Sequence, residues 1–557
     1  MRVLPSTNST IGKAALLWRT VRYLKPIQIY GRVCFQLVRP RLNLAPPPEC
    51  RQKRGPWQVP AHRAPSLVGP TRFRFLGEEA DLAEAGWDEP TRAKLWRYNQ
   101  HYFDDLNAHE ATGRRRWHTA VIERWIADNP PPRGSGWEPY PTSLRIVNWI
   151  KFALSGNELS DAARHSLAIQ TRWLLKRLEW HLLGNHLFAN AKALVFAGLF
   201  LAGEEADGWL RTGAQILRKQ MPEQVLADGA QFELSPMYHA IALEDLLDLA
   251  NVASAFGRND LAKDFASCIP AMLEWLLAMS HPDGEFAFFN DAAFGIAPDN
   301  AELLRYAHNL GFTVEPPSAG ITHHVESGYA RMELGAAVVI ADLARIGPDY
   351  LPGHAHADTL SFELSFGGKR FVVNSGTSVY GTGSERQRQR ATAAHSTLVL
   401  DGENSSEVWS GFRVGRRAKP FDVAVYGDET RLIAHGAHDG YTHLPGRPVH
   451  RRKWSLSEGQ LLVEDRVEGS GAHQLEDYFH LGPGISARVD TASGKVELSD
   501  IEGGRKATFS AEGGLVEVIP STWHPRFGRR IETAAIKVSA QRSLPHTMKC
   551  KLAWSAQ

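Results

Sequence analysis

The chain has 557 residues, of which 43% are hydrophobic and 22% are charged, with 63 lysines and arginines against 61 aspartates and glutamates. At roughly 150 residues per domain this length predicts a multidomain protein and excludes a small disulfide-stapled module. The net charge of +2 argues against nucleic-acid binding by the chain as a whole.

The cysteines and the apolar runs exclude two further classes. The four cysteines are scattered with no Cys-x-x-Cys pair, so neither a disulfide framework nor a thiolate metal site is predicted. The longest uncharged apolar run, residues 193–203, is shorter than the ~18 residues that span a bilayer. We predict no transmembrane helix, and no standard signal peptide is recognised.

Basic residues are concentrated at the start of the chain. Residues 1–54 contain eleven lysines or arginines and one acid, Glu49, a local charge of +10 that leaves −8 for the rest. Seven prolines between positions 46 and 70 indicate an extended connector. We predict a basic N-terminal arm and connector over residues 1–70, which either contacts a membrane surface, a polyanion or an acidic partner, or extends into solvent.

Two hydrophobic periodicities divide the remainder of the chain. Between residues 91 and 310 apolar residues recur every three or four positions, as in helices that bury one face. After residue 324 the spacing changes to two, with Gly367 and Gly368 as a hairpin turn. Strands are predicted at residues 336–341, 359–366, 369–373 and 397–400. Helices followed by strands predict two domains, placed at residues 71–315 and 316–557.

The segment 353–364 alternates as a strand would. His354, His356 and Asp358 then share a face that continues into the core. Polar groups on such a face are costly unless they are paired, bind a metal or line a cleft, so we predict a site here. With His395, which precedes the next strand, and an oxygen ligand, His356 could form a zinc-type site. A plain hydrogen-bonded cluster is the alternative.

Candidate residues also occur in the helical half. Asn185 and His186 follow Gly184 where a helical pattern is interrupted, and Asn185 is either a helix cap or a site residue. Tyr238 comes shortly after Pro236, in what we expect to be the first turn of a helix. Its phenol either projects from the helix mouth or joins the core.

An arginine-rich loop precedes His395. Arg386, Arg388 and Arg390 suit a ligand that carries carboxylate or sulfate groups, because guanidinium binds such groups bidentately. With Arg413, Arg416 and Arg417 they could form a local basic patch on the mildly acidic body. The alternative is a solvated run of charges.

Several segments, taken together, resemble the heparinase II/III family of polysaccharide lyases, which is similar to certain alginate lyases. The segments are residues 95–103, 136–140 with Arg145 and 148–149, 184–186, 228–238, 289–291, 353–358, 394–397 and 401–404. The resemblance implies an incomplete α/α toroid followed by an antiparallel β-sandwich, with the site in the cleft between them. It also implies β-elimination at a uronic acid of an anionic polysaccharide.

The resemblance implies roles for individual residues. Asn185 would neutralise the uronate carboxylate with His186 beside it. Tyr238 would be the general acid and a candidate base, His354 the catalytic histidine, and Tyr380 a second active-site tyrosine. Substrate contacts are expected from the following four residues: Arg145, Glu233, Arg388 and Arg390.

A structural zinc is also implied. His356 and His395 match its histidine ligands, and Asn374 stands where the family commonly has an aspartate, although a neutral amide is the weaker ligand. No organic cofactor is expected. The resemblance implies a bacterial cell-envelope or periplasmic location, and a cytoplasmic one stays open.

Two other functions compete with elimination. A glycoside hydrolase on a helical toroid would need two carboxylates about 5 to 10 Å apart. Its candidates are Glu233, Asp228, Asp283 and Asp291. A non-catalytic protein that binds or assembles polysaccharide is the other alternative.

Overall fold

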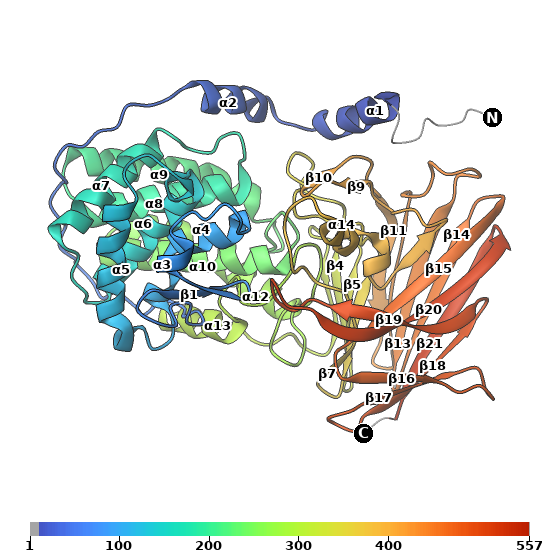
Figure 1. Ribbon diagram of the computed structural model, residues 1–557. Coiled ribbons are helices and arrows are strands. Elements are labelled where there is room, and N and C mark those ends of the chain that lie inside the picture. Colours follow the sequence, from blue (N-terminus) through green and yellow to red (C-terminus); the bar gives the residue numbers. More distant parts are fainter. Residues whose placement is uncertain (1–9, 556–557) are drawn as a thin grey trace.

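The computed structural model describes residues 10–555 and shows a helical domain followed by an antiparallel β-domain (Figure 1). Arg2, which belongs to the predicted basic arm, lies outside the described residues. The helices are α1 Thr10–Val21, α2 Pro26–Leu37, α3 Leu82–Ala85, α4 Lys94–Tyr102, α5 Arg115–Asp128, α6 Pro139–Leu154, α7 Asp161–Leu175, α8 Gly184–Phe200, α9 Glu204–Gln224, α10 Pro236–Ala255, α11 Asn259–Ala266, α12 Ile269–Ala278, α13 Asn300–Asn309 and α14 Ser384–Arg390.

The strands are β1 Arg72–Phe75, β2 Glu78–Asp81, β3 Gly320–His324, β4 Tyr329–Leu334, β5 Ala337–Asp342, β6 Phe362–Phe366, β7 Lys369–Val373, β8 Leu398–Leu400, β9 Val408–Trp409, β10 Arg413–Val414, β11 Pro420–Gly427, β12 Arg431–His438, β13 Val449–Ser457, β14 Gln460–Glu468, β15 Ala472–Leu481, β16 Ile485–Val489, β17 Val496–Asp500, β18 Lys506–Glu512, β19 Leu515–Trp523, β20 Ile531–Ser543 and β21 His546–Trp554. Helices thus precede strands, as the change of periodicity predicted.

The helical domain is an incomplete α/α toroid built around α8 and α10. Almost every side chain of these two helices is buried, because both are apolar on all sides. The buried charges on these two helices are paired: Lys192 on α8 donates to Asp245 and Asp248 on α10 at 2.7 Å each, and Glu244 on α10 pairs with Arg63. This core fixes the position of the N-terminal ends of α8 and α10, which carry Asn185 and Tyr238.

The β-domain is a sandwich of two large antiparallel sheets. One has the order β11-β12-β13-β14-β21-β18-β17-β16, and the other β19-β20-β15-β7-β6-β5-β4-β3 with β8 also paired to β15. Burial alternates along strands such as β14, whose apolar side faces the shared core. The fold class predicted from the sequence is therefore confirmed.

Local predictions in the β-domain have mixed outcomes. Gly367 and Gly368 do form the β6–β7 hairpin turn, both with positive φ, which this two-residue turn requires. The strand predicted over 359–366 begins only at Phe362, so His354, His356 and Asp358 lie in a loop rather than on a strand face. The arginine-rich loop is the short helix α14.

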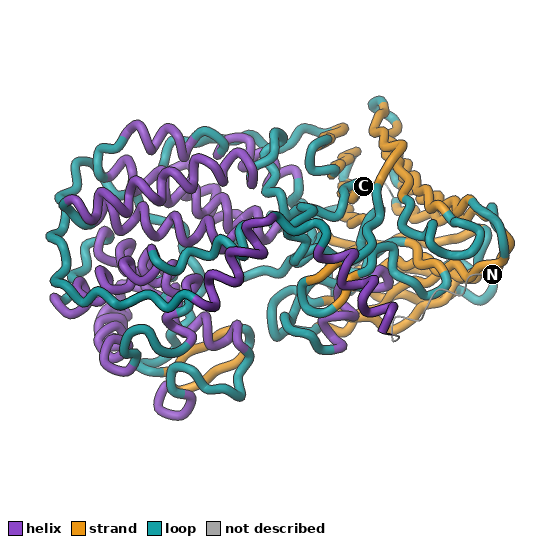
Figure 2. The backbone as a smooth tube through the Cα atoms, turned by 90° about the horizontal axis from the view of Figure 1, so that it is seen from above, coloured by secondary structure: helices purple, strands orange, loops and turns teal. Residues whose placement is uncertain are grey.

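Residues 10–42, with α1 and α2, form an N-terminal strap that crosses from one domain to the other. Figures 1 and 2 show α2 over the toroid and α1 over the β-domain. Arg177 of the toroid donates to the Phe35 carbonyl at 2.7 Å. Arg19 forms a bidentate ion pair with Glu407 of the β-domain, at 2.8 and 2.6 Å. The strap therefore ties the two domains together.

The helices offer no candidate for crossing a bilayer. Within residues 10–555, none combines sufficient length with sufficient apolarity.

Candidate functional site

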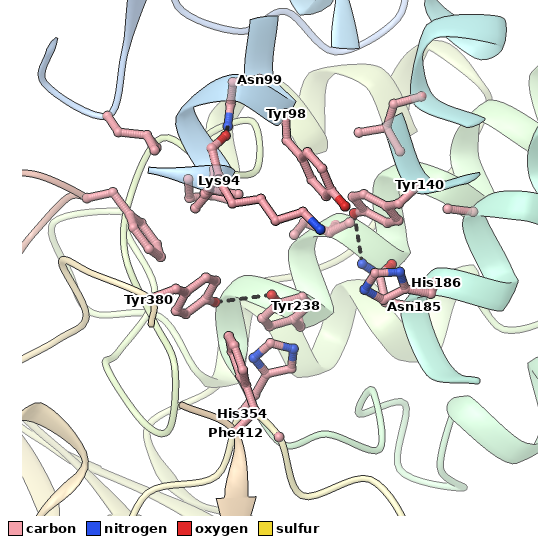
Figure 3. A pocket seen from close by; sticks show the side chains of 18 of the residues that line it. Lys94, Tyr98, Asn99, Tyr140, Asn185, His186, Tyr238, His354, Tyr380 and Phe412 are labelled. Atoms are coloured by element: carbon pink, nitrogen blue, oxygen red, sulfur yellow. Dashed lines mark hydrogen bonds between the residues drawn. The ribbon is translucent and has the colours of Figure 1, made fainter. Parts of the chain in front are cut away.

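A cleft of about 1800 Å³ lies between the toroid, the β-domain and the strap. Five residues that the resemblance assigned to catalysis line it: Asn185, His186, Tyr238, His354 and Tyr380. Leu17, Val21 and Leu24 of the strap also line it, so the strap covers one side of the cleft. Side chains distant in the sequence therefore meet in one cavity (Figure 3).

One wall of the cleft carries two tyrosines and a histidine. Ser235 caps α10 and accepts a hydrogen bond from the Tyr238 amide, which confirms that Tyr238 lies in the first helical turn. The ring of Tyr238 stacks on His354 with centroids 3.8 Å apart, and the Tyr238 hydroxyl lies 3.1 Å from the Tyr380 hydroxyl. Burial and the nearby Tyr380 raise the pKa of Tyr238 well above its usual value. The phenol is therefore protonated at neutral pH.

His354 is oriented by a buried carboxylate. Its Nδ1 lies 2.9 Å from Asp291 Oδ2, while its Nε2 lies 3.7 Å from Glu233 Oε2. Asp291 also pairs with Arg386 and accepts from Thr377. Burial alone would raise the pKa of Asp291, but the Arg386 guanidinium holds it well below its usual value. Because ionised Asp291 engages Nδ1, the Nε2 atom is left to face the cleft.

The opposite wall carries the amide and a second imidazole. Gly184 begins α8 with a positive φ and lies so close to Leu351 that a Cβ would fall 2.3 Å from its Cδ2. Asn185 does not cap the helix; its amide donates to the Tyr140 hydroxyl at 2.9 Å. Figure 3 shows Asn185 and His186 beside Tyr140, across from Tyr238.

His186 is suited to carry a positive charge. Its Nδ1 lies 3.2 Å from Glu179 Oε1. Burial would lower the pKa of His186, but the Glu179 and Glu233 carboxylates together raise the pKa overall. The wall thus presents an amide donor and a readily protonated imidazole to the cleft.

Three of the predicted substrate contacts do not reach the cleft. Arg145 is buried in the toroid, where it stacks on Trp125 at 3.8 Å. Arg390 is buried and donates to the Ala355 carbonyl at 2.9 Å. Arg388 pairs with Glu385 on α14 at 2.7 Å and is not among the lining residues. None of these three guanidiniums lines the cleft, and their substrate contacts therefore remain predictions without support from its geometry.

The fourth predicted contact, Glu233, does line the cleft. Of the carboxylates considered for hydrolysis it is the only one that does so. Asp228 binds Ser327, Asp283 pairs with Arg370, and Asp291 pairs with Arg386. Asp291 lies on the other side of His354 from Glu233 but does not line the cleft, so only one carboxylate of this set faces the cleft.

Behind His354 lies a buried group of metal-ligating side chains. Ligand atoms of His356, Asp358 and His395 all lie within 4.8 Å of one another. The expected oxygen ligand, Asn374, is committed elsewhere: its amide donates to the Phe288 carbonyl at 2.9 Å and its oxygen accepts from the Ser396 amide at 3.0 Å. Asp358 provides the carboxylate oxygen of this group.

Further side chains that line the cleft were not predicted from the sequence. Tyr140, which holds Asn185, was noted only as part of segment 136–140. Exposed Arg526 and Arg529, in the turn between β19 and β20, line the cleft and form no salt bridge with any residue in the described part of the chain. A turn with three arginines within five residues was the signal that could have revealed them.

The chain thus combines an α/α toroid with a β-sandwich, and the cleft between them is lined by asparagine, tyrosine and histidine side chains. Two protein-family models match this chain. The family described as Heparinase II/III N-terminus matches residues 78–308, and the family described as Heparinase II/III-like, C-terminal matches residues 316–555. The chain belongs to the heparinase II/III family.

Individual relatives agree with this assignment. A heparin-sulfate lyase of Pedobacter heparinus is 30% identical over 338 residues, 56% of this chain and 48% of the relative. A heparin-sulfate lyase of Bacteroides stercoris is 26% identical over 250 residues, 41% of this chain and 37% of the relative. The chain thus spans about half or less of the length of these relatives. A crystal structure of heparinase III shares the fold, with a TM-score of 0.66 and 17% identity over 100% of this chain and 88% of that one.

Proposed function

We propose that this protein is a carbon–oxygen lyase that cleaves an anionic, uronic-acid-containing polysaccharide by β-elimination. The observation that carries the proposal is the pair of facing walls: the stacked Tyr238 and His354 lie across the cleft from Asn185 and His186. The names of the relatives make heparin-like chains the first substrates to test. A place in the bacterial cell envelope is part of the proposal.

The first task of such a site is to make the C5 proton of the uronic acid removable. That proton is weakly acidic, and its loss places negative charge on the adjacent carboxylate. The Asn185 amide and protonated His186 would hold this carboxylate and stabilise the enolate-like charge. Preorganised donors in a water-poor cleft are suited to this because they need little reorganisation during the reaction.

Two proton transfers then complete the elimination. His354 Nε2 accepts the C5 proton, since Asp291 engages the other ring nitrogen. The C4–O4 bond breaks as the C4–C5 double bond forms, and Tyr238 gives its proton to the departing O4. The proton on His354 is afterwards returned to the tyrosinate, directly or through water, which restores both groups.

Arg526 and Arg529 are proposed to bind anionic groups of the polymer on the β-domain side of the cleft. Charge-assisted hydrogen bonds contribute roughly 1.5–3 kcal/mol when desolvated and less when exposed. Replacing both by glutamine should raise KM for an anionic polymer about tenfold and leave kcat within about twofold. The matched control is Arg542→Gln, an exposed arginine at the far end of β20. An unchanged KM in the double variant, or an equal rise in the control, would contradict this role.

The buried trio is proposed to hold one zinc ion. His356 Nδ1 and His395 Nε2 lie 3.1 Å apart, close to the roughly 3.3 Å between two nitrogens on a tetrahedral zinc. Burial lowers the pKa of His356 to about 4 and that of His395 to about 3, so both rings are neutral and able to coordinate. When bound, the ion would supply a fixed positive charge and hold the loop that carries His354.

Metal content tests this assignment. Purified protein should contain about one equivalent of zinc, and His395→Ala should lose it together with several degrees of melting temperature. The matched control is His109→Ala, from a second group, His62, His109 and Glu302, in which only His109 is exposed. In that group Arg305 already pairs with Glu302, so no metal loss is expected. Metal-free active protein, or equal loss from both variants, would count against the buried site.

Ultraviolet absorbance tests the proposed function as a whole. Elimination creates a double bond conjugated with the carboxylate, so absorbance should rise when the protein is mixed with a suitable uronic-acid polysaccharide. The panel should include heparan sulfate, heparin, alginate and other uronate polymers. New reducing ends without absorbance would indicate hydrolysis instead, and saturable binding without new chain ends would indicate a binding protein.

A further inference from the structure

The outer side of the strap carries a concentration of exposed apolar side chains. Nine of the twenty large hydrophobic side chains that are exposed within residues 10–555 fall between positions 17 and 44. Leu17 and Val21 line the cleft and Leu44 follows the strap, so the outer side of the strap carries the other six: Trp18, Ile29, Tyr30, Val33, Leu37 and Val38. Isolated exposed hydrophobic residues are ordinary, but a cluster on one short segment indicates a contact surface.

On α2 the apolar side chains form a stripe that faces away from the protein. Ile29, Tyr30, Val33 and Leu37 lie within one side of a helix and are 51–76% exposed. The opposite side is the one that contacts the domains: Gln28 donates to the Tyr350 carbonyl at 3.1 Å, and Arg177 lies 3.5 Å from the Phe35 ring centroid. The helix is therefore amphipathic with its apolar stripe directed outward.

Helix α1 also has an inner side that contacts the protein and an outer side that is exposed. Thr20 accepts from the Trp409 indole at 3.0 Å on the inner side, next to the Arg19–Glu407 ion pair. Trp18 is 61% exposed, and the exposed Arg22 lies 5.1 Å from its ring centroid. The indole and the guanidinium thus point away from the cleft, as they would at a boundary between apolar and aqueous media.

The charge on this surface has one sign. Residues 10–41 contain seven lysines or arginines and no acid. Arg19 and Lys25 are used in ion pairs with the two domains. Five others are exposed and form no salt bridge within residues 10–555: Lys13, Arg22, Arg32, Arg39 and Arg41, of which Arg32 lines the cleft. Lys13 lies on α1, Arg22 directly follows α1, and Arg39 and Arg41 follow α2, so the unpaired cations flank the apolar side chains.

We propose that the outer face of the strap docks on a bilayer that contains anionic phospholipid. An amphipathic helix that combines aromatic and aliphatic side chains with flanking arginines binds such a surface through apolar insertion and attraction to the headgroups. A second copy of the chain fits less well, because a two-fold contact through this face would place the unpaired cations against themselves. Docking would hold the cleft next to the membrane, and it does not depend on the reaction proposed above.

Sedimentation with lipid vesicles tests the proposal on the full chain. The protein should bind vesicles of phosphatidylcholine with about 30% phosphatidylglycerol at least about tenfold more tightly than vesicles of phosphatidylcholine alone. Binding should weaken at high salt, where surface charges are screened. No binding to the anionic vesicles, or equal binding to both kinds, would overturn the proposal.

Two double variants separate the two contributions. Arg22→Gln with Arg39→Gln should weaken binding about 25-fold, at about fivefold per basic residue. Tyr30→Ser with Val33→Ser should also weaken it at least about tenfold. The control, Val489→Ser with Leu515→Ser, removes exposed apolar groups from the β-domain and should leave binding unchanged. Unchanged melting temperatures would show that the variants are folded.

Alternative occupants give different results. If the apolar stripe joins two copies, the protein sediments as a dimer without lipid, Tyr30→Ser with Val33→Ser restores the monomer, and the proposal is overturned. If the cations bind the polymeric substrate instead, heparin is retained in proportion to the basic residues while vesicles are not, which also overturns it.

Discussion

Tyr238→Phe should lower kcat by about a thousandfold while KM stays within about threefold. The variant removes a single oxygen, so the ring keeps its stacking contact with His354 and the shape of the cleft is preserved. A positioned general acid contributes about 10²–10⁴ to the rate, and the buried phenol is the group placed to protonate O4. Turnover from absorbance and polymer binding by calorimetry would measure the two effects separately.

Tyr380→Phe is the matched control. Its hydroxyl lies 3.1 Å from that of Tyr238, so its loss should disturb the orientation of the acid and cost about tenfold. If Tyr380→Phe were the more damaging of the two, the roles would be exchanged. Nearly full activity in Tyr238→Phe would remove that residue from the mechanism.

Hydrogen exchange distinguishes the base from the acid. If His354 removes the C5 proton, Tyr238→Phe should still exchange that proton with deuterium in heavy water, although the chain is not cleaved. His354→Ala should show neither exchange nor cleavage. Absence of exchange in Tyr238→Phe would indicate that the phenol performs both transfers.

The order of helices and strands could be predicted because it depends on local periodicity. The conformation of the loop 353–361 could not be predicted, because its side chains alternate in direction for a reason other than strand geometry. The backbone N–H of His356 donates to Asn290 Oδ1, and the backbone N–H of Asn290 donates to Asp358. These contacts with a second loop, rather than a sheet, turn the alternate side chains inward. No local pattern distinguishes these two causes.

The arginines show why the site was only partly predictable. A run of arginines has the same local sequence pattern whether its side chains face solvent, a ligand or the core. Arg386 is buried because Asp291, 95 positions earlier, lies beneath it, and this long-range pairing cannot be read from either segment. The strap is a similar case: its charge is evident in the sequence, but the outward direction of its apolar stripe depends on which side packs against the domains.

Asp291→Asn should be the most damaging single substitution, because it acts on both stability and rate. The side chain is fully buried and contacts Arg386, His354 and His356. Breaking a buried ion pair costs about 3–5 kcal/mol, since the remaining charge is left unpaired. We expect the melting temperature to fall by about 5–10 °C in calorimetry.

The rate should fall as well, by about a thousandfold in kcat, because an amide no longer specifies which ring nitrogen of His354 carries the proton. Glu385→Gln is the control for charge loss near Arg386: it lies on the same helix but is partly exposed, and should shift the melting temperature by no more than about 2 °C. The double variant Asp291→Asn with Arg386→Met removes both charges. It should recover stability but not rate, because the orienting carboxylate is still absent. Recovery of both would mean that Asp291 acts only by neutralising Arg386, and no loss in Asp291→Asn would mean that the buried pair does not support the site.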